Sequence, residues 1–182
     1  GWIDGDGDGV REKEIEGEDV PLVLEFKHAS GSTAAENMSL MWKESLAKIG
    51  VKLNITSKEW TVFLEDIKSH NFEISTAGWS MGSGLSDMKQ IWHTESYNGG
   101  SNYVGFGNAE TDKLIESINY ENNVEARNKM YFKIQEIIHD EAPYIFLFTS
   151  KRKLAIHKRF DNANGYNDRP GYNAAEFKLN TT

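Results

Sequence analysis

The sequence contains no cysteine among its 182 residues, which excludes disulfides and thiolate chemistry but leaves the redox compartment open. No apolar run approaches the ~20 residues that a membrane-spanning helix needs. Basic residues are also scarce: Lys and Arg number 20 against 28 Asp and Glu, for a formal net charge of −8. A nucleic-acid partner is excluded, because phosphate neutralisation needs clustered Lys and Arg. The basic cluster at 151–153 is assigned to a solvated strand edge or turn.

An initiator Met and a signal peptide are missing, and the chain begins in mid-motif at Gly1-Trp2. We therefore expect a fragment or a processed chain, for which the missing signal does not indicate the cytoplasm. With 38% hydrophobic and 26% charged residues, the composition is that of a folded globular chain. We expect residues 1–182 to form a single α/β lobe, with an acidic Gly/Asp turn region at 1–20 and a loop-rich tail at 162–182.

Acidic residues alternate with glycine at the start of the chain. Asp4, Asp6 and Asp8 fall at the first, third and fifth positions of an EF-hand calcium loop. The twelfth position, which should carry a bidentate Glu, is Ile15, although Glu12 or Glu14 is a candidate substitute. An acidic β-turn between two strands is the interpretation we favour, and a calcium site at the three aspartates is the alternative.

The next part of the chain alternates between strand and helix patterns. Residues 21–28 and 51–56 follow the period of two of a strand, and a 3.6-residue apolar period follows each of them. Thr33 and Glu36 form an expected capping box for the first helix, and Ser57 is the expected cap of the second. Met38, Trp42 and Ile49 in the first helix and Trp60 in the second are assigned to the core. This β-α-β-α-β order predicts a parallel sheet flanked by helices, which is an α/β fold.

Residues 72–79 are expected to form a third, buried strand, which ends at Gly78-Trp79 and leads into the glycine-rich loop 80–84. Ligands of open parallel sheets bind beyond the carboxyl ends of the strands. Trp79 and this loop are therefore the candidate binding site, with packing of Trp79 in the core as the alternative. Tyr97, Tyr103 and Phe106 follow, and they either line the same cleft or close the core.

The second half is predicted to be mainly helical. A short helix is expected at 87–92, and Asn108 and Asn123 are the expected caps of two further helices, the second ending before Pro143. Residues 144–148 are apolar on both faces and are predicted to form a central strand, with one more strand at 154–156.

Motifs of enzyme chemistry are missing from the sequence. It has no Gly-x-Ser-x-Gly elbow, no His-Glu-x-x-His and no phosphate-binding loop. The five histidines are scattered without metal-ligand spacing, so a surface or helix-end role is expected for each. The expectation is a protein that is not an enzyme.

Several short motifs follow one another in a fixed order over roughly residues 1–165: Gly1-Trp2-x-Asp4 with Asp6-Gly7-Asp8-Gly9, Ala47-Lys48-Ile49-Gly50-Val51, Glu59-Trp60, Gly78-Trp79, Asn102-Tyr103-x-Gly105-Phe106, Asp112-Lys113-Leu114-Ile115, Arg127 with Gln135-Glu136-Ile137-Ile138, and Glu141-x-Pro143. This ordered set resembles the C-terminal part of extracytoplasmic solute-binding proteins of the peptide/nickel ABC-transporter class. The resemblance implies a periplasmic-binding-protein type II lobe, most of the second of two lobes that close around a ligand. It further implies three partners: a peptide or other small solute, a missing N-terminal lobe and a membrane permease.

The resemblance also implies site residues. Trp79 corresponds to a cleft residue of the family, and Ser80 and Met81 correspond to positions in the loop after it. Peptide binders carry an Asp three residues beyond this Trp, which pairs with the α-amino group of the peptide. That position is Gly82 here, and the nearest acid is Asp87, which is the candidate replacement.

The function expected from the sequence is capture of an extracellular solute, a peptide or peptide-like molecule, and its delivery to an ABC-transporter permease. The expected location is periplasmic or extracytoplasmic, with a lipid anchor in the parent protein left open. No cofactor is expected apart from the calcium alternative at Asp4, Asp6 and Asp8. A calcium-stabilised structural or adhesion module is the alternative function.

Overall fold

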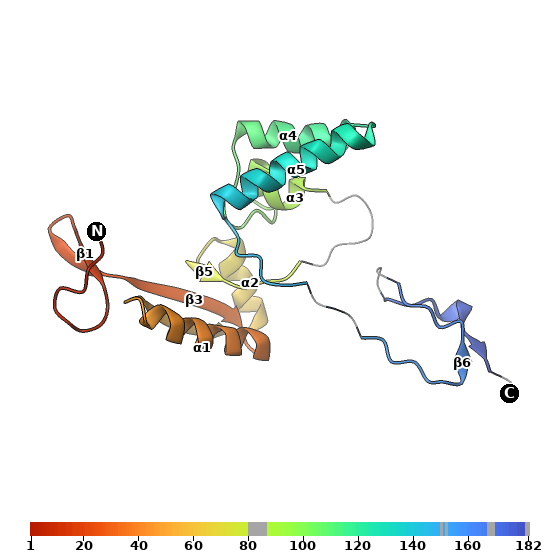
Figure 1. The fold of residues 1–182 in the computed structure, drawn as a ribbon, viewed down its shortest axis with the longest axis horizontal. Coiled ribbons are helices and arrows are strands. Elements are labelled where there is room, and N and C mark those ends of the chain that lie inside the picture. The colour runs from red at the N-terminus through yellow and green to blue at the C-terminus, as the bar shows by residue number, and fades with distance from the viewer. Residues whose placement is uncertain (80–86, 150, 152, 167–169, 181–182) are drawn as a thin grey trace. The chain divides into compact units, whose positions relative to one another are not determined.

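The computed structural model describes residues 1–79, 87–149, 151, 153–166 and 170–180 (Figure 1). These residues form two compact units, Gly1–Gly78 and Trp79–Thr182. The single lobe that the sequence predicts would require these two units to associate, and this stays a prediction.

The first unit begins with an antiparallel hairpin of β1 (Glu12–Ile15) and β2 (Glu18–Pro21). Glu16 and Gly17, which join the strands, have φ angles of 55° and 87°. Two successive residues with positive φ are typical of the tight turns that match the twist of a hairpin. The acidic region at the start of the chain therefore leads into a defined hairpin.

A three-stranded parallel sheet with the order β4-β3-β5 organises the rest of this unit. Its elements, in chain order, are β3 (Val23–Ala29), α1 (Thr33–Ala47), β4 (Lys52–Lys58), α2 (Trp60–Lys68) and β5 (Ile74–Ser75). The predicted α/β fold with a parallel sheet flanked by helices is confirmed. β3 is the central strand, and its Phe26 is fully buried and meets Trp42 of α1 edge to face, with ring centroids 5.5 Å apart.

Both predicted helix caps of this unit are wrong by one or two residues. Ser32 rather than Thr33 caps α1, because its hydroxyl accepts a hydrogen bond from the Ala35 N–H. Glu59 caps α2, since β4 continues past Ser57 to Lys58.

Two residues assigned to the core, Ile49 and Trp60, are instead exposed. Ile49 lies beyond the end of α1 at Ala47, so the helical period no longer turns it inward. Trp60 is the first residue of α2, where the side chain lies at the start of the helix.

The expected buried strand at 72–79 is much shorter in the structure. β5 pairs with β3 only through Ile74 and Ser75, and both are half-buried. Among the described residues, β5 has β3 as its one neighbour in the sheet. Residues 76–79 continue from it as irregular chain.

The second unit has a core of helices. α3 (Lys89–Trp92), a 3-10 turn η1 (Thr94–Ser96), α4 (Ala109–Tyr120) and α5 (Val124–Glu141) surround a cluster that includes Trp92, Phe106, Ile115 and Ile134. The predicted caps of the two long helices are confirmed: the Asn108 side chain accepts from the Glu110 and Thr111 N–H groups, and that of Asn123 accepts from Ala126.

The end of the chain has little regular structure. β6 (Phe160–Asp161) and β7 (Lys178–Leu179) form a short antiparallel pair, and η2 (Ala174–Glu176) lies between them in sequence.

The strands predicted at 144–148 and 154–156 are wrong, because neither stretch lies in a strand. Ile145, Phe146 and Phe148 are 73%, 69% and 76% exposed. The described residues offer these segments no strand to pair with, since the parallel sheet consists of β4, β3 and β5. An apolar sequence predicts burial, but a strand forms only beside another strand.

Candidate ligand-binding site

The half-exposed indole of Trp79 is the centre of the candidate site. Trp79 is the first residue of the second unit, and 43% of its surface is exposed. Its ring stacks on that of Tyr103, with centroids 5.9 Å apart and planes inclined by 15°. An indole held by another ring and partly open to solvent offers an apolar surface to a ligand.

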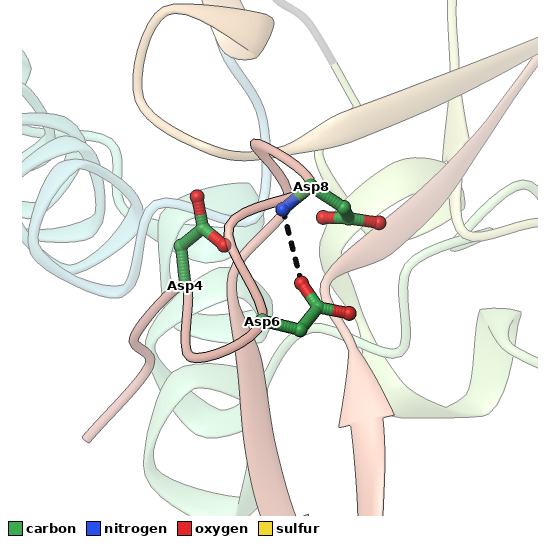
Figure 2. A group of neighbouring side chains, drawn as sticks. All are labelled: Asp4, Asp6 and Asp8. Carbon is green, nitrogen blue, oxygen red and sulfur yellow. Dashed lines mark hydrogen bonds between the residues drawn. The ribbon is translucent and has the colours of Figure 1, made fainter.

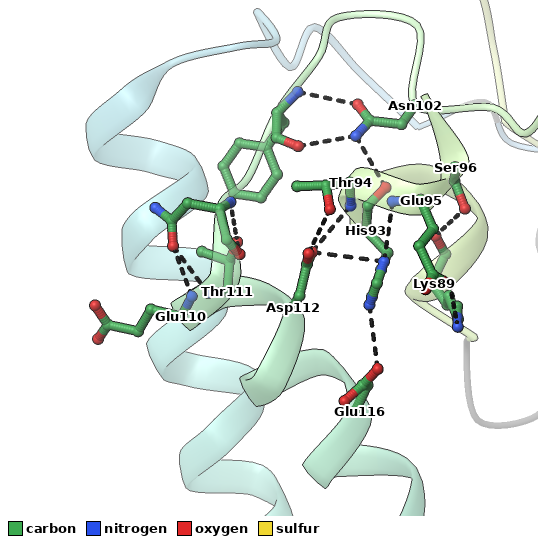
Figure 3. Close-up of polar contacts among 12 residues, drawn as sticks. Lys89, His93, Thr94, Glu95, Ser96, Asn102, Glu110, Thr111, Asp112 and Glu116 are labelled. Atoms are coloured by element: carbon green, nitrogen blue, oxygen red, sulfur yellow. Dashed lines mark hydrogen bonds and ion pairs between the residues drawn. The ribbon is translucent and has the colours of Figure 1, made fainter. Parts of the chain in front are cut away.

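Tyr103 is positioned by a loop that closes around Asn102. The Asn102 side chain is fully buried, donates to the backbone carbonyls of His93 (3.1 Å) and Phe106 (2.8 Å), and accepts from the Phe106 N–H (3.0 Å). Figure 3 shows these contacts beside α4. The Asn102 side chain is therefore satisfied by three backbone partners, which fixes the loop conformation.

Tyr144 connects the site to the buried core. Its ring lies 4.9 Å from that of Trp92, which meets Phe106 edge to face at 5.2 Å. Burial raises the pKa of the Tyr144 phenol above its usual value, and a hydrogen bond from the Trp79 side chain partly offsets this rise. The neutral phenol is thus favoured in the folded protein.

The other predicted site residues are Ser80, Met81, Gly82 and Asp87. Ser80, Met81 and Gly82 lie outside the described residues. Asp87 is exposed, and its Oδ1 accepts from the Lys89 N–H at 2.9 Å at the start of α3.

The three aromatic residues after the glycine loop divide between the two predicted roles. Tyr103 joins Trp79, whereas Phe106 is 3% exposed and closes the core. Tyr97 is 40% exposed and lies over Gly105, whose φ of 67° and close approach to that ring suit glycine.

A buried histidine contact was not predicted from the sequence. His93 Nδ1 lies 3.6 Å from Asp112 and Nε2 lies 3.4 Å from Glu116, both in α4 (Figure 3). The Glu95 N–H donates to Nδ1 at 3.1 Å, so the neutral ring carries its proton on Nε2. Asp112 also accepts from the Thr94 N–H at 2.9 Å. These contacts connect η1 to α4, and the predicted helix-end role holds for His93, which caps both α3 and η1.

The surface or helix-end role predicted for every histidine is wrong for His28. It lies within β3 and is 2% exposed, with Nδ1 2.9 Å from the Ala29 carbonyl oxygen. The neighbours of a central strand bury it whatever its polarity.

The acidic loop brings its three aspartates together. Asp4, Asp6 and Asp8 each offer a carboxylate oxygen within 4.8 Å of the others, and all three are exposed (Figure 2). Asp4 accepts from the backbone N–H groups of Gly7 (2.8 Å) and Gly9 (3.1 Å), and Glu12 accepts from that of Gly5. Oxygen ligands at this spacing suit a hard cation such as calcium, but the same hydrogen bonds are those of an acidic turn.

A hollow of about 870 Å³ lies beside this loop, and its lining includes Asp6, Asp8, Glu12, Glu14 and Asp19. Its carboxylates would favour a cation over an anionic ligand. The predicted calcium site stays a prediction.

Comparison with known families places the chain among binding proteins. Residues 1–102 match the family described as bacterial extracellular solute-binding proteins, family 5, middle region. The chain belongs to this family of extracellular solute-binding proteins.

Individual relatives agree with the family. Oligopeptide-binding protein AppA of Bacillus subtilis (strain 168) is 29% identical over 181 residues, which are 98% of this chain and 32% of the relative. Heme-binding protein A of Haemophilus influenzae is 36% identical over 100 residues, which are 54% of this chain and 18% of the relative. The chain thus spans about a third or less of the length of these relatives.

A solved structure matches over almost the whole chain. The structure of AppA from Bacillus subtilis in complex with a nonapeptide has a TM-score of 0.82 and 27% sequence identity, and the match covers 99% of this chain and 35% of that one. The predicted periplasmic-binding-protein fold is therefore confirmed, and these relatives are binding proteins rather than enzymes. Among the described residues, no helix combines the length and apolarity that crossing a membrane requires.

Proposed function

We propose that this chain is the ligand-contacting lobe of a solute-binding protein that captures an extracellular peptide or peptide-like molecule and delivers it to an ABC-transporter permease. One observation carries the proposal: the chain matches an oligopeptide-binding protein over 98% of its length. Trp79 supports it, because this half-exposed residue follows β5 in the sequence and ligands of such folds bind beyond the carboxyl ends of strands. The proposed activity is binding without catalysis.

The proposed partner within the same protein is a second, N-terminal lobe. Ile145, Phe146 and Phe148 are more than two-thirds exposed on a single extended segment. Apolar surface of this kind marks a contact site, and the AppA relative has two-thirds of its length beyond the match. A strand of the other lobe would cover this segment and supply the hydrogen-bond partners that it lacks among the described residues.

Hydrogen exchange tests the partner lobe. In the full-length protein, the amides of residues 144–149 should be protected, since pairing with a strand closes them to water. Exchange of the same amides in the denatured protein serves as the unprotected reference. Exchange of residues 144–149 as fast as that of the reference would contradict the pairing.

The proposed ligand is tested with a pool of short peptides, with the amine free or acetylated, added to the full-length protein. A ligand that binds only the native state stabilises it, by about 2.7 kcal/mol at a hundredfold excess over Kd. The free-amine pool should raise the melting temperature more than the acetylated pool. If neither pool stabilises the protein, the peptide proposal is overturned. Stabilisation by hemin instead would indicate a heme ligand, as named for the Haemophilus relative.

Asp87 is proposed to supply the counter-charge for a peptide amine, because Gly82 cannot. Asp87→Asn should remove the preference for free-amine peptides by about an order of magnitude in affinity. Asp140→Asn is the matched control, since Asp140 is an exposed acid at the end of α5. Equal preference in wild type and Asp87→Asn would exclude Asp87 as the anchor.

Calcium binding at Asp4, Asp6 and Asp8 is a separate proposal, because these carboxylates converge. Calcium at millimolar concentration should raise the melting temperature of the wild type by several degrees and leave the variant in which all three are Asn unchanged. A shift below about one degree in the wild type would remove the proposal and, with it, the calcium-stabilised structural or adhesion module, for which the relatives give no support.

A further inference from the structure

The orientation of the Trp79 ring depends on Tyr103. On one side the Tyr103 ring lies nearly parallel to the indole, at 5.9 Å and 15°. Such an offset stack restrains a large side chain that is otherwise 43% exposed. Without Tyr103, one face of the indole would lose its contact.

Tyr103 is itself held by the polypeptide on either side. Asn102, the preceding residue, makes three hydrogen bonds of 2.8–3.1 Å within the buried turn. The Tyr103 hydroxyl lies 3.4 Å from the Ser101 Oγ. The ring that supports Trp79 is therefore part of a fixed turn rather than a mobile surface side chain.

We propose that Tyr103 is a positioning residue that presets the Trp79 indole, and that the open part of the indole takes a flat apolar group of the ligand, such as an aromatic side chain of a peptide. This inference rests on the proposed function for its ligand, but not for the preset ring. A preset ring adds affinity because its rotamer entropy is lost on folding and not on binding. The stack leaves part of the indole uncovered, which distinguishes this arrangement from ordinary core packing.

Fluorine NMR of the full-length protein labelled with 5-fluorotryptophan tests the preset ring without a ligand. The variant Trp79→Phe identifies the Trp79 resonance among those of the five tryptophans of this chain. Tyr103→Leu should move that resonance toward the position of free fluorotryptophan, and Tyr103→Phe, which keeps the ring, should restore it.

Tyr120→Leu is the matched control, because Tyr120 ends α4 and is 84% exposed. It should leave the Trp79 resonance in place. A Trp79 resonance that Tyr103→Leu moves no more than Tyr120→Leu does would overturn the positioning role.

Calorimetric titration tests the ligand class with two peptide pools, one rich in Phe and Tyr and one in which Ala replaces them. Wild type should prefer the aromatic pool, and Tyr103→Leu should weaken binding of that pool by about threefold to tenfold while binding the Ala pool as before. A purely structural defect would weaken both pools alike, and that result would overturn the inference. Binding of both pools by wild type with equal affinity would overturn the ligand class but leave the proposed function intact. Failure of both pools would instead refute the proposed function, and the NMR result would then decide the positioning role alone.

Discussion

β3 and the segment 144–149 are both apolar stretches, yet they differ completely in their surroundings. β3 pairs with β4 along its whole length and with β5 at Phe26 and Lys27, and Phe26 is fully buried. Phe148 in the other segment is 76% exposed. Neighbouring strands, and not apolar content alone, therefore decide whether a stretch becomes a buried strand in this chain.

The same contrast extends to polar residues. Lys27 of β3 is buried, yet its ammonium donates to the Asn71 carbonyl oxygen at 2.6 Å and lies 3.4 Å from Asp66. Burial of a charge is tolerated where partners replace water. β3 therefore depends on specific partners for its polar groups as well as for its apolar ones.

The strongest test of the contrast exchanges phenylalanine for alanine in both stretches. Phe26→Ala should destabilise the protein by about 3–5 kcal/mol, because it leaves a cavity in the centre of the first unit. Phe148→Ala should cost much less in this chain alone, as its ring is exposed. Urea denaturation measures both, and similar losses in this chain would contradict the contrast.

Asn102→Ala should have the next largest effect, because it leaves buried groups of His93 and Phe106 without partners. The expected loss is about 1–3 kcal/mol for each buried group left unpaired. Asn102→Asp keeps the acceptor for the Phe106 N–H but loses both donors, so it should remain destabilised. Full stability of Asn102→Asp in thermal unfolding would show that the two donated bonds are unimportant.

The smallest expected effect concerns Asp66. A hydrogen bond from Asn71, assisted by Lys27, lowers the pKa of Asp66 below its ordinary value of 3.8. A lowered pKa in the folded state adds stability above pH 3.8, and this stability is lost as the pH falls through the folded value. Asp66→Asn should therefore lower the melting temperature at pH 7 by roughly one or two degrees, because the Lys27 ammonium keeps its hydrogen bond to the Asn71 carbonyl oxygen.

The control for Asp66 is the same comparison in acid, where the difference between wild type and Asp66→Asn should narrow as the pH falls below 3.8. A constant difference between pH 7 and pH 3 would show that the amide acts through packing and not through lost charge. Asp161→Asn, at an exposed position of β6, should have no effect at either pH.

Local patterns predicted most of the regular structure. The alternation in β3 and β4 and the asparagine caps at Asn108 and Asn123 are signals carried by a few adjacent residues, and the structure confirms them. Residues 144–148 show where such signals fail, since their apolar pattern indicates burial but carries no information on the partner.

The candidate site was predicted only in part for the same reason. Gly78-Trp79 at a strand end marked the indole, but its stack on Tyr103 and the contacts of His93 with α4 join residues far apart in sequence. A periodic pattern over a few adjacent residues cannot reveal such distant pairs. The sequence signal that could have indicated a fixed loop there was the position of Asn102 in a turn-rich stretch.

A contact between Trp79 and the ligand can be measured by comparing two exposed tryptophans. Trp60 is the matched residue, because it is 57% exposed and lies 6.0 Å from the ring of Phe63. Titration of the full-length protein with the free-amine peptide pool should show affinity reduced about tenfold or more in Trp79→Ala and unchanged in Trp60→Ala. Equal affinity in Trp79→Ala and Trp60→Ala would show that Trp79 does not contact the ligand.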